Sequence, residues 1–133
     1  MTMASEKFER GLKIRTEVLG KDYVEKATKN VDDFNREFQQ MVTEYCWGGI
    51  WGREGIISHK QRSMLNLAML AALNRPHEFE LHMRGALNNK VSLDEIREVL
   101  MQVAVYCGIP AGVEAFRIAR KVIAEEKAAG AKL

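Results

Sequence analysis

The sequence contains little cysteine and little proline, and it has no apolar run long enough to cross a membrane. Its two cysteines, Cys46 and Cys107, lie far apart and form no Cys-x-x-Cys pair. This pattern excludes a disulfide framework, and we expect buried free thiols in a reducing cytoplasm. The longest nearly apolar stretch, 64–73, is interrupted by Asn66 and is too short for a bilayer. It is typical of a helix that its own domain or a second subunit surrounds.

Charge of either sign is not in excess. The formal net charge of +2 comes from dispersed basic residues, which gives no basis for binding nucleic acid or an acidic membrane. The N-terminal residues are charged and no apolar segment follows them, so no signal peptide is expected. With 133 residues, two prolines and no Ser- or Gly-rich linker, the chain is predicted to form one soluble, cytoplasmic domain, 1–133.

Apolar residues recur at helical spacing, and no stretch alternates long enough to form a strand. We therefore predict an all-α fold of about six helices joined by short turns. Capping residues indicate where helices begin, and glycine and proline indicate where they stop or restart. The signals are Asn30, Ser58 and Ser92 (with Glu95) for starts, Gly20 and Gly108 for ends, and Pro76 and Pro110 for first turns.

The stretch 45–62 holds both tryptophans of the chain and four of its ten glycines. Four glycines within 48–55 would each cost roughly 1 kcal/mol relative to alanine inside a helix. We therefore predict a loop here that forms the wall of a pocket. Trp47 and Trp51, together with Tyr106, would line this pocket, although aromatics at helical spacing are more often core residues.

Two arginines bracket the end of this stretch. Arg53 and Arg62 can each bind a carboxylate through two parallel hydrogen bonds. The helix start after Ser58 adds a field that favours an anion. The alternative is that Arg62 pairs with an acidic residue elsewhere in the chain.

His82 follows Glu78 by one helical turn, so the two side chains can meet. A carboxylate beside an imidazole raises its pKa and fixes its tautomer, as a proton donor near neutral pH requires. The alternative is an ordinary surface pair or a histidine satisfied in the core. No metal site is expected, because His77 and His82 are five residues apart and point about 140° apart, at ~100° per residue.

Taken in order and spacing, these residues resemble the carboxymuconolactone decarboxylase family over almost the whole chain. The motifs that carry the resemblance are Trp47-Gly48, Trp51 and Arg53, Arg62-Ser63, Leu67-Ala68, 78–82 with Ala86, 95–99, and 106–111.

The resemblance implies a fold like that of alkyl hydroperoxidase D and a ring-shaped homo-oligomer, a hexamer. It also implies a carboxy-lyase that needs no cofactor. The reaction of the family removes CO2 from 4-carboxymuconolactone and gives 3-oxoadipate enol-lactone, in the protocatechuate branch of the bacterial β-ketoadipate pathway. The apolar 64–73 helix suits such an assembly.

Fitting the residues to this chemistry gives each a predicted role. Arg53 and Arg62 would bind the anionic groups of the substrate, and His82 would deliver a proton. Glu78 or Glu80 would orient His82. A dry pocket would be shaped by Trp47, Trp51 and Tyr106.

Two positions depart from the usual pattern of the family. The segment 54–58 replaces a shorter Pro-Gly-Leu-Asp sequence, and Lys90 stands where a glycine is usual. A paralogue that acts on a related lactone or keto acid is therefore an alternative.

Two further classes of protein are alternatives to a decarboxylase. Thiol peroxidases of the wider superfamily need Cys-x-x-Cys before the histidine, but here those positions hold Arg75 and Glu78. A non-catalytic helical oligomer that binds a small ligand is the remaining alternative.

Overall fold

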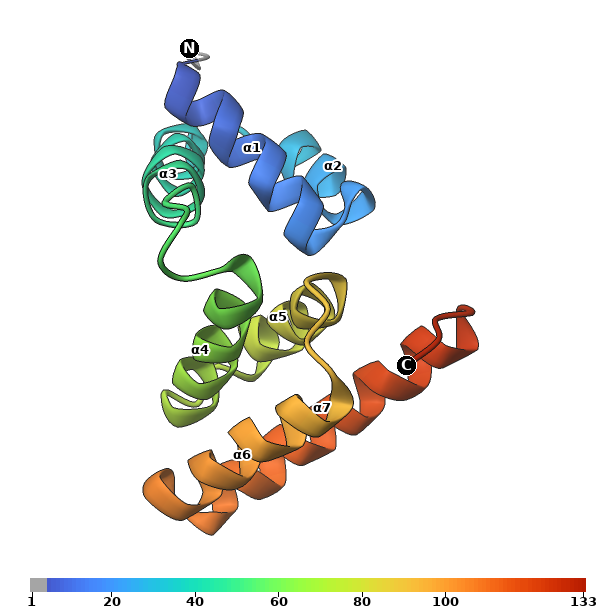
Figure 1. Cartoon of the computed structure of the whole chain (residues 1–133). Coiled ribbons are helices and arrows are strands. Elements are labelled where there is room, and N and C mark those ends of the chain that lie inside the picture. The colour runs from blue at the N-terminus through green and yellow to red at the C-terminus, as the bar shows by residue number, and fades with distance from the viewer. Residues whose placement is uncertain (1–4) are drawn as a thin grey trace. The chain divides into compact units, whose positions relative to one another are not determined.

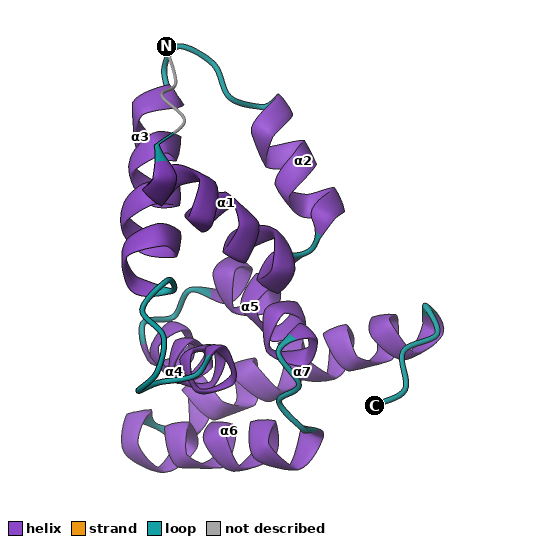
Figure 2. Ribbon diagram, turned by 45° about the horizontal axis from the view of Figure 1, so that its top comes forward, coloured by secondary structure: helices purple, strands orange, loops and turns teal. Residues whose placement is uncertain are grey.

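A computed structural model describes residues 5–133 (Figure 1). Within this range the chain forms seven α-helices and one π-helix. The described part has no strand, and Figure 2 accordingly shows only helices and loops. The all-α prediction is confirmed, and the expected number of about six helices was one too low. The elements are α1 (Glu6–Leu19), α2 (Lys21–Lys29), α3 (Arg36–Met41), η1 (Val42–Ile50), α4 (His59–Ala72), α5 (Pro76–Asn88), α6 (Leu93–Cys107) and α7 (Ile109–Ala128).

The contacts of the chain group into two compact units, and the boundary between them in the sequence falls between His59 and Lys60. The first unit holds α1 to η1, and the second holds nearly all of α4 together with α5, α6 and α7. The single domain expected for 1–133 stays a prediction, and the two units are described separately below.

In the first unit, α1 packs against η1 at very short range because both elements carry glycine where their backbones meet. A Cβ atom on Gly11 would overlap the carbonyl oxygen of Thr43, and one on Gly48 would overlap the carbonyl oxygen of Lys7. Any larger residue at either position would force the two elements apart.

This contact explains why the loop predicted for 45–62 is wrong over its first part. Gly48 and Gly49 lie inside the π-helix η1, and only the segment from Trp51 to Ser58 is irregular. Helix propensity disfavours glycine, but the close packing of Gly48 on α1 requires it. Gly55, with φ +100°, does occupy the left-handed region that glycine tolerates.

The helix predicted to begin after Asn30 begins instead at Arg36. Asn30 is the C-cap of α2. The carboxylate of Asp32 accepts hydrogen bonds from the backbone N–H groups of Phe34 and Asn35, at 2.9 and 3.0 Å. Short polar side chains compete with the helix for backbone groups in this way, and here the turn prevails.

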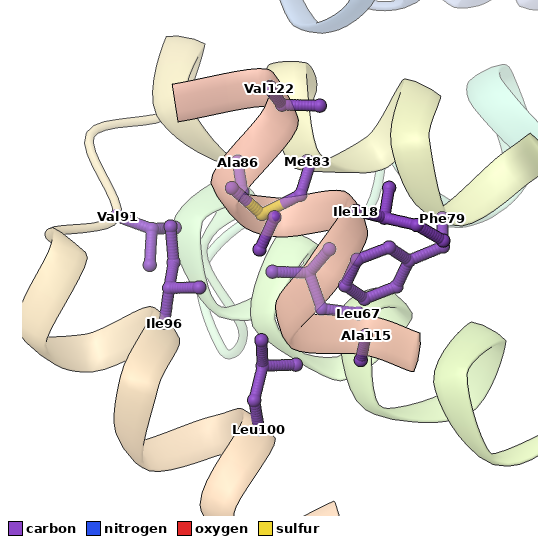
Figure 3. Packing of buried hydrophobic residues seen from close by; sticks show 11 residues of the cluster. Leu67, Phe79, Met83, Ala86, Val91, Ile96, Leu100, Ala115, Ile118 and Val122 are labelled. Atoms are coloured by element: carbon purple, nitrogen blue, oxygen red, sulfur yellow. The ribbon is translucent and has the colours of Figure 1, made fainter. Parts of the chain in front are cut away.

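The second unit is built around one apolar core that α4, α5, α6 and α7 enclose (Figure 3). Leu67, Met83 and Leu100 are completely buried in it. The backbones of α6 and α7 approach closely at a glycine, since a Cβ on Gly112 would lie only 2.6 Å from the Cβ of Ala104. The core residues are Leu67, Phe79, Met83, Ala86, Val91, Ile96, Leu100, Ala115, Ile118, Ala119 and Val122.

Local signals set the helix ends of this unit as predicted. Ser92 and Glu95 form a reciprocal capping box, with bonds of 3.0 and 2.9 Å. Pro76 occupies the first turn of α5. Gly108, at φ +108°, ends α6.

Lys90, at the position where the resemblance leads us to expect a glycine, adopts φ +68°. A side chain with a Cβ is strained in this left-handed region, by roughly 1 kcal/mol. We expect Lys90→Gly to raise the free energy of unfolding by about 0.5–1 kcal/mol, because the relief of strain exceeds the added entropy of the unfolded chain. Chemical denaturation measures this change.

The matched control is Lys26→Gly in the interior of α2, where glycine should lower stability by about 1 kcal/mol. A loss of stability in Lys90→Gly as large as that of the control would show that Lys90 is unstrained.

Large apolar side chains remain exposed in the single chain. These include Leu65 and Met69 on α4 and Leu73 directly after it, so the surrounded helix predicted for 64–73 is only half buried here. Further exposed side chains on α6 and α7 are Met101, Val105, Tyr106, Ile109 and Val113. Among the described residues, no helix combines the length and apolar character that a bilayer crossing requires.

Candidate functional site

The aromatic part of the candidate site lies in the first unit. Trp47, on η1, and Trp51, directly after it, are 4% and 3% exposed, and their ring centroids are 4.8 Å apart. The wide turn of the π-helix carries Trp47, and π-helical segments occur frequently at functional sites. The structure therefore brings the two tryptophans together as one buried pair.

His59, which the sequence left without a role, supports this pair. Its ring lies 5.6 Å from that of Trp51, and its Nε2 donates a hydrogen bond to the carbonyl oxygen of Trp51 at 2.9 Å. This bond takes up a carbonyl group where regular helix ends, so the role of His59 is to fix the backbone that carries Trp51.

Arg53 follows the pair on the irregular segment. Its side chain is exposed, and its backbone N–H bonds the carbonyl oxygen of Ile50 at 3.0 Å. An exposed guanidinium close in sequence to a buried aromatic pair is suited to meeting an anion from solvent.

The polar part of the candidate site lies on α4 and α5 in the second unit. The Nδ2 of Asn66, on α4, lies 3.5 Å from the Nδ1 of His82, on α5. Ser63 and Asn89 are hydrogen-bonded at 2.9 Å, so the start of α4 faces the end of α5 and the helices are antiparallel. Arg62 precedes Asn66 by one turn and therefore points to the same side of α4.

His82 is largely buried, and this burial decides its charge. Desolvation lowers its pKa to about 4, while the negative charge of Glu78 acts in the opposite direction. The predicted rise is therefore wrong in sign, although the contribution of Glu78 has the expected direction. At neutral pH the imidazole is uncharged.

The choice between the two candidate orienting carboxylates favours Glu78. Glu80 accepts hydrogen bonds from Lys121 at 2.9 Å and from Arg84 at 3.2 Å. These partners lower the pKa of Glu80, Lys121 making the largest contribution. Glu80 thus belongs to an ion-pair cluster with α7, and the charge that acts on His82 is that of Glu78.

Tyr106 and the cysteines lie where the sequence did not place them. Tyr106 is 82% exposed near the end of α6, so the single chain does not show it as a pocket wall. Cys46 and Cys107 are free and exposed, not buried as predicted. Packing around the sulfur still raises the pKa of the Cys46 thiol, although the positive charge of Arg15 acts in the opposite direction. The raised pKa reduces the reactivity of this thiol.

Within residues 5–133, no three His, Cys, Asp or Glu side chains are grouped as a metal site would need. The positions that precede His82 where a thiol peroxidase has cysteines are occupied by Arg75 and Glu78, both on the surface.

A buried neutral imidazole has a chemistry different from that of an imidazolium. It can donate a hydrogen bond to an oxyanion that forms during a reaction, without a charge of its own. Asn66 is a member of this group that the sequence did not single out as functional. The available signal was its position as the one polar residue inside the apolar run 64–73.

The candidate site residues therefore form two sets of side chains, one in each unit. Trp47, Trp51 and Arg53 form one set, and Arg62, Asn66, Glu78 and His82 form the other. That both sets line a single pocket stays a prediction from the sequence.

Comparison with known proteins finds relatives that are named as decarboxylases. The chain is 38% identical over 117 residues to the 4-carboxymuconolactone decarboxylase of Acinetobacter baylyi, covering 88% of this chain and 87% of that protein. It is 44% identical over 116 residues to the nitrosuccinic acid decarboxylase of Metarhizium robertsii, covering 87% of this chain and 80% of that protein. The sequence pattern of the carboxymuconolactone decarboxylase family matches residues 36–121, which include every predicted site residue. The chain is therefore a decarboxylase that belongs to the carboxymuconolactone decarboxylase family.

Proposed function

We propose that the protein removes CO2, without a cofactor, from a dicarboxylic acid in which the carbon that loses a carboxylate leaves a carbanion that delocalises into a carbonyl or nitro group. The observation that carries this proposal is the contact of His82 with Asn66, on a face of α4 that also presents Arg62, in surroundings that lower the pKa of His82 to about 4. A neutral donor beside a guanidinium suits a reaction in which negative charge moves from a carboxylate onto another oxygen.

The first candidate substrate is 4-carboxymuconolactone, converted into 3-oxoadipate enol-lactone as in protocatechuate catabolism. The bond to the departing carboxylate breaks, and its electron pair passes through the ring double bond to the lactone carbonyl as an enolate. A proton taken from solvent water by the carbon next to that carbonyl completes the reaction. The relative from Acinetobacter baylyi, which is named for this reaction, supports this candidate.

The second candidate is nitrosuccinic acid, supported by the higher identity of 44% to the fungal relative. Loss of the carboxylate beside the nitro group would leave a nitronate, which a proton on carbon converts into 3-nitropropanoate. In both reactions the electron pair is stored on an oxygen, and a second carboxylate stays on the product. One site could therefore serve either acid, and a related lactone or keto acid would fit the same description.

Each predicted residue has a part in this proposal. Arg62 and Arg53 bind the carboxylates, and His82 donates a hydrogen bond to the enolate or nitronate oxygen as charge develops. Glu78 acts on His82 through its charge. The pair Trp47 and Trp51, together with Tyr106, would exclude water from the reacting carbon, which strengthens these electrostatic interactions.

The test is to incubate the purified chain with each acid in turn, follow the release of CO2, and identify the product by proton NMR. Release of CO2 from either acid would establish the substrate class and the better substrate. Binding of both acids without release would overturn the proposal and favour a ligand-binding protein.

Replacing Arg62 should weaken catalysis of whichever acid reacts. We expect Arg62→Met to lower kcat/KM by roughly 10- to 100-fold, because charge-assisted hydrogen bonds contribute about 1.5–3 kcal/mol. The loss should appear mainly in KM, since the bound carboxylate persists through the reaction. The exposed Arg53 should give the smaller effect of the two when replaced by Met.

The matched control is Arg97→Met on α6, whose guanidinium is paired with Asp94 on an exposed surface. A loss in Arg62→Met no larger than in this control would remove Arg62 from the site.

We further propose that the protein is a cytoplasmic homo-oligomer in the form of a ring-shaped hexamer. The exposed apolar side chains support assembly, since monomeric proteins rarely leave many large apolar groups in water. On α6 and α7, Val105 is 76% exposed and Ile109 is 67% exposed. Tyr106 lies among them, so a neighbouring subunit that covers this surface would also bury Tyr106.

A further inference from the structure

We propose that Asn66 is a positioning residue that holds His82 in the tautomer with its proton on Nε2. This inference deepens the proposed function, because a proton on Nε2 makes that ring nitrogen the hydrogen-bond donor that His82 offers to the developing oxyanion. The tautomer of His82 can be determined in the absence of any substrate, so this part of the inference is tested separately from the proposed function.

The geometry between α4 and α5 supports the assignment. The Nδ2 of Asn66 lies 3.5 Å from the Nδ1 of His82, at the long end of hydrogen-bonding distance. An amide nitrogen carries only donors, so the ring nitrogen that it faces must present its lone pair. In a neutral imidazole the remaining nitrogen, Nε2, then carries the proton.

The burial of Asn66 and His82 also supports this assignment of the tautomer. Asn66 interrupts the apolar run of α4 and is half buried, where an unsatisfied amide would cost free energy. The ring of His82 is largely buried and uncharged at neutral pH, so it exists as one tautomer or the other. A contact that favours one tautomer therefore sets which ring nitrogen donates and which accepts.

The opposite orientation of the amide would have the opposite consequence. With Oδ1 of Asn66 toward the ring, Nδ1 would carry the proton and Nε2 would be a base. His82 could then take up a proton but could not stabilise an oxyanion through Nε2. The two orientations thus predict different roles for His82, and the tautomer distinguishes between them.

The experiment records proton–nitrogen correlation spectra of the full chain with isotope-labelled histidine at neutral pH. The chain has three histidines, and the spectrum of His82→Gln assigns the His82 signals by their absence. We expect the proton of His82 on Nε2 in the wild-type protein. A proton on Nδ1 would overturn the proposal, whether or not the protein decarboxylates anything.

Two variants test whether Asn66 determines the tautomer of His82. Asn66→Asp replaces the donor by a carboxylate acceptor and should move the proton to Nδ1, whereas Asn66→Gln keeps an amide donor and should leave it on Nε2. With the tautomer lost, kcat should fall roughly 10- to 100-fold in Asn66→Asp with KM little changed, and Asn66→Gln should recover part of it. An unchanged His82 tautomer in Asn66→Asp would overturn the role of Asn66.

The two proposals fail in separable ways. If neither candidate acid reacts but the tautomer shifts as described, the proposed function fails and the contact between Asn66 and His82 stands. If the wild-type protein releases CO2 but Asn66→Asp keeps the wild-type tautomer and kcat, only the role of Asn66 is lost.

Discussion

Replacing His82 by alanine should reduce decarboxylation about 100- to 1000-fold in kcat. This is the usual cost of removing one preorganised donor to an oxyanion, about 2.7–4 kcal/mol. The effect should be large because the ring is held in a desolvated position between α4 and α5, where water cannot replace its hydrogen bond equally well. Steady-state release of CO2 from the better of the two candidate acids measures it.

His77→Ala is the matched control, since His77 is exposed and lies on the same helix. It should keep wild-type kcat. Near-wild-type turnover in His82→Ala would exclude His82 from the mechanism.

The pH profile tests the charge state of His82 separately. With a pKa lowered to about 4, the neutral imidazole is the working form, so its contribution to kcat/KM should stay constant from pH 8 down to about pH 5. The contribution should be lost as pH falls through that pKa. A kcat/KM that rises as pH falls below 6.5 would show instead that the imidazolium acts as the proton donor first predicted from the sequence.

Phe79→Ala should lower the free energy of unfolding of the second unit by about 3–5 kcal/mol. The ring is 1% exposed and belongs to the core between α4, α5 and α7, so its loss removes buried apolar contacts and leaves a cavity. Phe79 lies one turn before His82 on α5, so part of the change should also appear as lower kcat. Chemical denaturation followed by far-ultraviolet circular dichroism measures the change in stability.

Phe34→Ala is the control for this substitution. Its ring is 97% exposed, so the stability should change by no more than about 0.5 kcal/mol. A loss below about 1 kcal/mol in Phe79→Ala would mean that the core around it collapses to fill the space, or that Phe79 is packed less tightly than its burial indicates.

The sequence predicted helix ends well where neighbouring residues decide them. The reciprocal bonds of Ser92 and Glu95 need only a three-residue spacing, and Gly20 and Gly108 need only their freedom at positive φ. The prediction failed at Asn30. The side chain of Asp32 there stabilises a turn through backbone hydrogen bonds, and the local residues suit this turn as well as they suit a helix start. Local rules thus located most boundaries and missed one that two local arrangements could satisfy.

Features that depend on distant contacts could not be predicted in the same way. Gly48 is helical because its backbone meets Lys7, more than forty residues earlier. The pKa of His82 is lowered because the whole fold removes water from it, while the sequence showed only the opposing charge of Glu78. The contact with Asn66 likewise depends on how α4 and α5 pair.

The buried pair formed by Trp47 and Trp51 makes the first unit spectroscopically distinct. These are the only two indoles of the chain, so tryptophan fluorescence, excited selectively, reports on this unit and not on the core around Phe79. With ring centroids 4.8 Å apart, their transitions should couple and give a paired positive and negative band in circular dichroism. The loss of that couplet on heating or in denaturant would follow the opening of η1 independently of the helices that carry His82.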